Sequence, residues 1–132
     1  AVDGATVAAL LGRDPGEVYK TLVTRGASKA NYVFVVPVLA ELDLKKAAKT
    51  VGEKSIELIH VKELTPLTGY VRGGCSPIGM KKRFKTVVDA SAQAHAAILV
   101  SAGKIGRQVE LSPDALVGLI GGSFASVVKG DE

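Results

Sequence analysis

The sequence predicts an α+β fold, with a curved, mixed or mainly antiparallel sheet and helices packed around it. Short runs of β-branched and aromatic residues, such as 32–38 and 86–89, are separated by isolated helical patterns. The order shows no regular strand–helix–strand repeat, which disfavours a doubly wound parallel sheet. The 132 residues are too few for two ordinary domains, so residues 1–132 are expected to form one.

The chain is expected to open with two helical segments. Asp3 is a candidate N-cap for the first, and Gly12 fits its C-terminal end. Residues 14–17 (Asp-Pro-Gly-Glu) have proline at the first helical position and glutamate three residues after the cap, which is typical of a helix start. Only a short turn fits there, because a strand pattern follows directly.

Two strand patterns come next and are expected to form a hairpin. Residues 19–24 suit a strand, and residues 32–38 (Tyr-Val-Phe-Val-Val-Pro-Val) are almost entirely β-branched or aromatic. Residues 25–30, which include a glycine and a serine, could close the turn between them. Because proline cannot donate to a strand ladder, Pro37 should lie where the second strand reaches a sheet edge or a bulge.

The rest of the chain is expected to mix short helices with short strands. Asp43 is predicted to cap a helix that ends at Gly52 and exposes a lysine face. Ser112 and Pro113 open a last helix, which is expected to end near residues 121–122. The other predicted elements are strands at 55–60, 86–89, 97–100, 108–111 and 124–128, and one or two helical turns at 63–68.

Composition favours a soluble protein of a reducing compartment, the cytoplasm. Apolar residues make up 47% and charged residues 23% of the chain, and no apolar run approaches the roughly 20 residues of a transmembrane helix. A single cysteine cannot form an intramolecular disulfide. The cysteine and the two histidines form no metal-binding pattern, so no metal or other cofactor and no membrane partner is expected.

Positive charge is concentrated in one part of the chain. Residues 64–109 hold seven cations and one acid, Asp89, which gives a net charge of +6, whereas the rest of the chain carries −2. One interpretation is a polyanionic partner, and the other is a solvated surface that only aids solubility. The position of the charges around two glycine-rich segments favours the first. The cations are Arg72, Lys81, Lys82, Arg83, Lys85, Lys104 and Arg107.

The densest glycine segment is residues 73–82, Gly-Gly-Cys-Ser-Pro-Ile-Gly-Met-Lys-Lys. Glycine lets the backbone bend tightly and approach a ligand, and Pro77 stiffens the turn. Free backbone N–H groups beside positive charge suit a phosphate, a carboxylate or a developing oxyanion. A tight turn without a ligand is the alternative.

Three segments, in this order and at this spacing, carry a family resemblance: residues 18–23 (Val-Tyr-Lys-Thr-Leu-Val), 73–82 and 100–106 (Val-Ser-Ala-Gly-Lys-Ile-Gly). Together with residues 32–44 they resemble the YbaK/EbsC family over nearly the whole chain. These small trans-editing proteins hydrolyse mischarged aminoacyl-tRNA and are similar to the editing domain of bacterial prolyl-tRNA synthetases. The resemblance implies a barrel-like sheet surrounded by helices. Members usually carry a further N-terminal segment, so the domain in residues 1–132 is expected to lack one.

The resemblance also implies which residues form the site. The expected catalytic residues are Lys20, Gly73, Gly74 and Ser101. The lysine would hold a phosphate or the ester carbonyl region, and the N–H groups of the glycine pair would bind the carbonyl oxygen. The expected substrate-binding residues are Thr21, Ser76, Pro77, Gly79, Gly103 and Gln108, and the expected tRNA-binding residues are Arg72, Lys81, Lys82, Arg83 and Lys104.

The sequence contains no evident protein nucleophile or general base. Ser101 lacks a nucleophile elbow, and Cys75 lacks a base because His60 and His95 form no recognisable dyad. Cys75 is better interpreted as a buried structural residue, and both histidines as surface or packing residues. The resemblance instead implies substrate-assisted chemistry, in which the cysteinyl thiol of the substrate attacks its own ester carbonyl.

The leading hypothesis is therefore a trans-editing deacylase, an ester hydrolase that acts on mischarged Cys-tRNA(Pro). The alternatives are a deacylase of another mischarged tRNA such as Ala-tRNA(Pro), and a non-catalytic module that binds aminoacyl-tRNA or a synthetase. Gln108 keeps the binding module open, because some relatives carry an acidic residue at this position. The expected partners are the aminoacylated 3′ end of tRNA and prolyl-tRNA synthetase, with the protein a monomer or a weak dimer.

Overall fold

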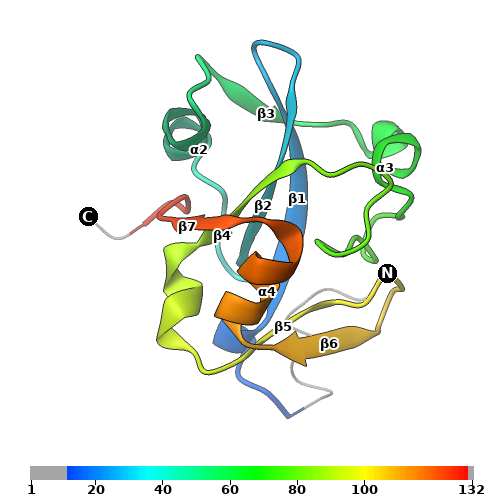
Figure 1. Cartoon of the computed structure of the whole chain (residues 1–132), viewed down its shortest axis with the longest axis vertical. Helices are drawn as coiled ribbons and strands as arrows, with labels where there is room; N and C mark the ends of the chain where they lie inside the picture. Colours follow the sequence, from blue (N-terminus) through cyan, green and yellow to red (C-terminus); the bar gives the residue numbers. More distant parts are fainter. Residues whose placement is uncertain (1–11, 131–132) are drawn as a thin grey trace.

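The computed structural model describes residues 12–130, which form two β-sheets and three α-helices (Figure 1). The larger sheet has the strand order β3-β1-β2-β4-β7, and β5 pairs with β6 in the smaller one. The strands are β1 (Tyr19–Gly26), β2 (Asn31–Pro37), β3 (Ile56–Leu58), β4 (Lys85–Asp89), β5 (Ile98–Ser101), β6 (Gln108–Leu111) and β7 (Ser123–Ala125). The helices are α2 (Leu44–Val51), α3 (Val61–Thr68) and α4 (Pro113–Ile120), with short 3-10 turns η1 (Pro15–Glu17) and η2 (Ala90–Ala94).

The pairing of the strands confirms a mixed, mainly antiparallel α+β fold. β1 is antiparallel to β2 and to β3, whereas β2 pairs with β4 and β4 pairs with β7 in parallel. The smaller sheet is antiparallel and meets the larger one at a parallel bridge between Val18 and Leu99. Within residues 12–130 the strands form two sheets and no closed barrel, so the barrel-like closure stays a prediction.

β1 and β2 form the predicted hairpin. Their antiparallel register places Lys20 opposite Val36, and Lys29 adopts the left-handed conformation (φ 80°) in the turn. β2 is a central strand, between β1 and β4, but β4 pairs only with residues 32–35. Pro37 therefore lies at the end of β2 beyond its β4 partner, where no N–H donor is needed on that side.

The helix ends match the capping residues that the sequence predicts. The Oδ1 atom of Asp43 accepts hydrogen bonds from the backbone N–H groups of Lys45 (3.0 Å) and Lys46 (3.1 Å) at the start of α2. α2 ends at Gly52, which adopts a left-handed conformation with φ 77°. At the start of α4, the Oγ atom of Ser112 accepts a hydrogen bond from a backbone N–H in the first turn.

The remaining predicted elements are present with shifted ends or lie outside the described residues. The strand expected at 55–60 is shorter in the structure, where β3 pairs with residues 24–26 of β1. The turn expected at 14–17 is η1, whereas the helix expected to end at Gly12 lies outside the described residues. None of the helices in the described part of the chain combines the length and apolar character that crossing a membrane requires.

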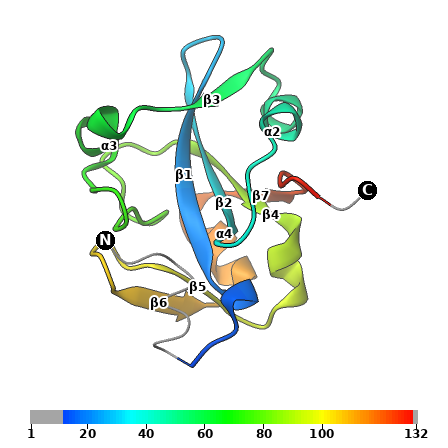
Figure 2. The same ribbon diagram turned by 180° about the vertical axis from the view of Figure 1, so that it is seen from behind.

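The central strand β2 is buried on both faces. Residues 33–36 (Val-Phe-Val-Val) are all 0% exposed. Phe34 and Val36 pack in a cluster with residues of α2, whereas Val35 packs on the opposite face in a cluster with residues of α4. α4 accordingly lies in front of the larger sheet in Figure 1 and behind it in Figure 2. Because paired residues of β1 and β2 share a face, the two faces of β1 also point toward different parts of the protein.

Asp89, the single acid of the basic segment 64–109, points into the protein. The residue is 3% exposed at the end of β4. Its Oδ1 atom accepts a hydrogen bond from the N–H of Val127 (3.0 Å), and its Oδ2 atom accepts one from the N–H of Ser91 (3.1 Å). The carboxylate thus ties the chain after β7 to the end of β4, and the surface of this segment presents cations without a carboxylate of its own.

We expect Asp89→Ala to lower the free energy of unfolding by about 3 kcal/mol, because the buried N–H of Val127 loses a charged acceptor. Urea unfolding followed by circular dichroism measures the change. Asp114→Asn is the matched control, because Asp114 is exposed in the first turn of α4, and it should cost less than about 1 kcal/mol. Equal losses in the two variants would contradict the anchoring role of Asp89.

Candidate functional site

The glycine loop lies against the turn that joins β5 to β6. A Cβ atom on Gly74 would come within 3.2 Å of the backbone N of Ile105, and one on Gly73 would lie 3.5 Å from the Cγ1 atom of Ile105. Gly73 also has a φ of 85°, a conformation that favours glycine. The two glycine-rich segments that the sequence singles out therefore meet in space, and the missing Cβ of Gly74 permits the contact.

One N–H group of the glycine pair is already engaged. The backbone N–H of Gly74 donates to the carbonyl oxygen of Val71 at 3.0 Å and closes a turn. The hydrogen bonds found within residues 12–130 include none from the N–H of Gly73. Gly73 is therefore the member of the pair whose N–H can serve a bound oxygen without breaking the turn.

Lys20 lies near the start of β1, on the face that also carries Val18. Val18 pairs with Leu99 in parallel register, and Ser101 follows Leu99 by two residues on the same face of β5. This register places Lys20 and Ser101 on one common face. Lys20 is partly buried, and burial lowers the pKa of its ammonium below the usual value, while the negative charge of Glu41 acts in the opposite direction.

Ser101 and Gln108 lie directly opposite each other in the β5–β6 pair, so their side chains share a face. The Oγ atom of Ser101 accepts a hydrogen bond from the N–H of Gly103 at 3.2 Å. The Oε1 atom of Gln108 is shielded from solvent and has no hydrogen-bond partner in the described structure. A buried polar atom without a partner is costly, so this oxygen is a candidate acceptor for a ligand.

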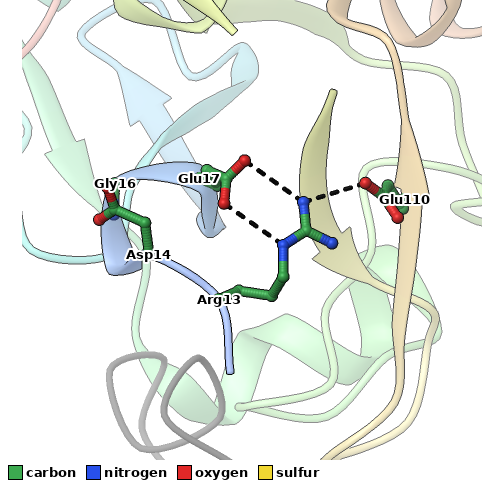
Figure 3. Close-up of polar contacts among 5 residues, drawn as sticks. All are labelled: Arg13, Asp14, Gly16, Glu17 and Glu110. Atoms are coloured by element: carbon green, nitrogen blue, oxygen red, sulfur yellow. Dashed lines mark hydrogen bonds and ion pairs between the residues drawn. The ribbon is translucent and has the colours of Figure 1, made fainter. Parts of the chain in front are cut away.

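A cavity of about 290 Å³ lies at Gln108. Arg13 lines this cavity, and Figure 3 shows its guanidinium between Glu17 and Glu110. It donates to the two carboxylate oxygens of Glu17 at 3.3 Å each and to Oε2 of Glu110 at 3.0 Å. These hydrogen bonds raise the pKa of Arg13 and lower the pKa of Glu17. The cavity is lined by Arg13, Leu99, Gly106, Gln108 and Glu110.

Four residues near the site are not predicted from the sequence. Arg13 and Glu17 have the i, i+4 spacing of a helical ion pair, which could have been recognised, but Glu110 is 97 residues from Arg13. Tyr70 connects the two loops: its hydroxyl donates to the carbonyl oxygen of Ile78 at 2.5 Å, and its Cε1 atom lies 3.0 Å from a Cβ position on Gly103. No spacing rule links such distant residues before the chain is folded.

Thr21 lies on the face of β1 opposite to Lys20, because side chains alternate along a strand. It shares its face with Tyr19 and Val23, and Val23 packs with Cys75 of the glycine loop. The Oγ1 atom of Thr21 is shielded from solvent and has no hydrogen-bond partner in the described structure. The structure thus separates Thr21 from the face that carries Lys20.

Ser76, Pro77 and Gly79 lie further along the loop. Ser76 is 3% exposed, and its Oγ atom accepts a hydrogen bond from the N–H of Ile78 at 3.1 Å, so it stabilises the loop itself. A hollow of about 180 Å³ begins here and is separate from the cavity at Gln108. Pro77 and Gly79 line it together with Lys82 and Arg83, and with Leu119 and Ile120 of α4.

The five residues expected to bind tRNA are all exposed: Arg72, Lys81, Lys82, Arg83 and Lys104. In the described part of the chain no salt bridge joins any of them to a carboxylate. Lys104 lies in the turn that contacts Gly74, and a guanidinium nitrogen of Arg83 donates to the carbonyl oxygen of Leu119 at 3.5 Å. The cations therefore surround both ends of the glycine loop and remain available to an anionic partner.

Cys75 is a structural residue, as the sequence predicts. It is 9% exposed and packs with Val23 and Val33, and burial raises the pKa of its thiol to about 11. His60 is exposed at the start of α3, and the ring of His95 packs edge-on against Tyr19 with a centroid distance of 6.3 Å. No group of three metal-ligating side chains is close enough to hold an ion within residues 12–130.

Comparison with known proteins supports the family resemblance. The model of a family described as an aminoacyl-tRNA editing domain matches residues 2–119. The chain is 52% identical over 122 residues to EbsC of Enterococcus faecalis, which is named as a candidate Cys-tRNA(Pro)/Cys-tRNA(Cys) deacylase. The match covers 92% of this chain and 74% of that protein.

Solved structures show the same fold over almost the entire chain. A candidate trans-editing enzyme for prolyl-tRNA synthetase superposes with a TM-score of 0.87 at 26% identity, over 96% of this chain and 80% of that one. A scaffold protein used for computational grafting of linear epitopes superposes with a TM-score of 0.90, also at 26% identity, over 99% of this chain and 83% of that one.

We expect Gly74→Ala to lower the free energy of unfolding by about 1–3 kcal/mol, because the new methyl group would press on backbone atoms of the β5–β6 turn. Gly118→Ala is the matched control. Gly118 lies in α4 with no atom within 4 Å of an added Cβ, so alanine should stabilise the protein by about 0.5–1 kcal/mol. Urea unfolding of both variants tests the contact, and a neutral effect of Gly74→Ala would disprove it.

Proposed function

We propose that this chain, which belongs to the aminoacyl-tRNA editing domain family, is a trans-editing deacylase that hydrolyses mischarged Cys-tRNA(Pro). The observation that supports the proposal is that Lys20, Ser101 and Gln108 share one face, and that Gly73 and Gly74 contact the β5–β6 turn that follows Ser101. The relative with 52% identity, which is named for the same activity, supports the choice of substrate.

The proposed reaction is substrate-assisted. The cysteinyl thiol attacks the carbonyl carbon of its own ester, so a C–S bond forms and the bond from that carbon to the terminal ribose oxygen breaks. The thiol proton passes to the departing ribose oxygen, and the resulting cyclic thioester opens with water. Such a path needs a protein that orients the ester and stabilises the oxyanion, without supplying its own nucleophile. Cys75 is not needed, since its thiol is buried and protonated at neutral pH.

The polar groups on the common face have distinct roles in this proposal. The ammonium of Lys20 stabilises negative charge on the ester or on the terminal phosphate, and its partial burial strengthens that interaction by reducing the screening by water. The free N–H of Gly73 is the candidate oxyanion donor. Ser101 and the unpartnered Oε1 atom of Gln108 orient the aminoacyl group by hydrogen bonding.

The proposal extends to the partners of the protein. The exposed cations Arg72, Lys81, Lys82, Arg83 and Lys104 bind the phosphates of the tRNA 3′ end, so binding should weaken as salt rises. The similarity to a trans-editing protein of prolyl-tRNA synthetase supports that synthetase as a second partner. Aminoacyl-tRNA is used in the cytoplasm, so a cytoplasmic location is part of the proposal. A monomer or weak dimer and a barrel-like closure of the two sheets around the site are part of it as well.

We expect Lys20→Ala to slow single-turnover hydrolysis of Cys-tRNA(Pro) by about 100-fold or more, because one preorganised electrostatic contact to the oxyanion is lost. Lys54→Ala should keep the full rate, because Lys54 is exposed just before β3, which pairs with the end of β1 that is remote from Lys20. Ala-tRNA(Pro) and Pro-tRNA(Pro) are measured in parallel. If only Ala-tRNA(Pro) is hydrolysed, the substrate is Ala-tRNA(Pro) and not Cys-tRNA(Pro). If the protein binds tRNA but hydrolyses none of the esters, it is a binding module.

The rate should also fall at alkaline pH. Burial lowers the pKa of Lys20 below its usual value of 10.5, so the ammonium is lost, and the rate falls, at a lower pH than for an exposed lysine. Glu41→Gln removes a charge that raises this pKa, so the fall should begin at a still lower pH. Rates corrected for spontaneous ester hydrolysis measure the shift, with Glu57→Gln on the exposed β3 strand as control. Identical profiles for Glu41→Gln and wild type would exclude Lys20 as the titrating group.

A further inference from the structure

The hollow between the glycine loop and α4 combines an apolar lining with an uncovered apolar rim. Its volume is about 180 Å³, and Met80, Phe84 and Ile120 supply apolar walls. Leu119 on the rim is 59% exposed, which is high for a large apolar side chain next to a concavity. The volume lies below the roughly 300–1,000 Å³ of drug-sized pockets, so the hollow suits a single flat ring system.

Cations flank this apolar hollow and no acid lines it. A guanidinium nitrogen of Arg83 donates to the carbonyl oxygen of Leu119 at 3.5 Å, which holds the planar group over the end of α4. Its remaining donors, and the ammonium of Lys82, have no carboxylate partner among residues 12–130. An apolar surface for a ring beside a cation for a phosphate is the combination that binds an unstacked nucleotide.

The hollow lies close to the reaction site along the same loop. Gly74 contacts the β5–β6 turn, and Ile78 lines the hollow. Four residues of chain span at most about 14 Å. At roughly 3.4 Å per stacked nucleotide, no more than about four nucleotides are needed to cover this separation. The unpaired 3′ end of a tRNA has this length, so an RNA whose terminal ester lies at Gly73 can place one of its last bases at the hollow.

We propose that the hollow beneath Lys82, Arg83 and Leu119 binds one unpaired base of the tRNA 3′ segment, with the adjoining phosphate on the two cations. The subsite is distinct from the residues that hold the reacting ester, and the proposal rests on the proposed function for the identity of the RNA. An acidic peptide would satisfy the cations equally well, but the apolar walls of the hollow and its size favour a nucleotide.

The test uses the full chain and an uncharged, fluorescently labelled RNA minihelix that ends in four unpaired nucleotides. Leu119→Ala should weaken its binding by about 5-fold or more, measured by fluorescence anisotropy at fixed salt, because the apolar contact to the base is lost. Leu119→Ala should not change the weaker binding of a blunt-ended minihelix, which offers phosphates but no unpaired base. Leu39→Ala is the matched control, because Leu39 is 69% exposed and lies outside the hollow, and it should bind as wild type does.

Replacing each of the four unpaired nucleotides in turn by an abasic one locates the base. One abasic replacement should weaken binding to the wild-type protein by the same factor as Leu119→Ala does. The same replacement should not weaken binding to the Leu119→Ala variant any further, because the base and the leucine would lose one shared contact. The proposal is wrong if no replacement couples to Leu119, or if a poly-glutamate peptide displaces the minihelix and abasic replacements have no effect. If Leu119→Ala and an abasic replacement are coupled but the protein does not hydrolyse Cys-tRNA(Pro), only the proposed function is rejected. If the protein hydrolyses Cys-tRNA(Pro) but the two changes are not coupled, only the base subsite is rejected.

Discussion

The structure depends on the burial of β2 on both of its faces. Residues 33–36 are fully buried, so a slip of one residue would exchange the apolar sets that face α2 and α4. The same register controls the neighbouring strand, in which Lys20 lies opposite Val36 and Thr21 lies opposite Val35. The ammonium and the hydroxyl that adjoin in the sequence therefore point to opposite faces. The positions of the polar groups in the proposed site thus depend on the packing of β2, although β2 itself contributes no polar group to the site.

The glycine loop connects two concave regions that would act on different parts of one substrate. At one end, Gly73 and Gly74 contact the β5–β6 turn, beside the face that carries Ser101 and Gln108. At the other end, Pro77 and Gly79 open into the hollow at α4. The hydroxyl of Tyr70 holds the loop from within by donating to a loop carbonyl. Such a fixed loop would set the distance between the reacting ester and the base that is bound further along the RNA strand.

The acidic residues of the two regions have different structural roles, and this leaves the regions with different surface charge. The carboxylate of Asp89 accepts hydrogen bonds from two backbone N–H groups inside the protein. The surface of the basic segment 64–109 therefore has no acid of its own. At the cavity beside Gln108, the carboxylates of Glu17 and Glu110 are instead held by Arg13. A polyanion would therefore meet unopposed positive charge at the glycine loop, whereas the ion-pair network at the cavity has one cation and two carboxylates.

Local sequence patterns were sufficient to predict the helices and strands whose ends are determined by neighbouring residues. Asp43 and Gly52 mark the two ends of α2 as predicted, and the hairpin between β1 and β2 follows from the β-branched and aromatic residues of the two strands. The sequence also identified Cys75 as a buried residue, since no base accompanied it. Only the tertiary structure decided which distant groups meet. It brought Arg13 to Glu110, engaged the N–H of Gly74 in a turn, and placed Gln108 at one concave region and Pro77 and Gly79 at another. Such contacts depend on strand register and sheet order, which arise when the whole core is buried and which no local spacing encodes.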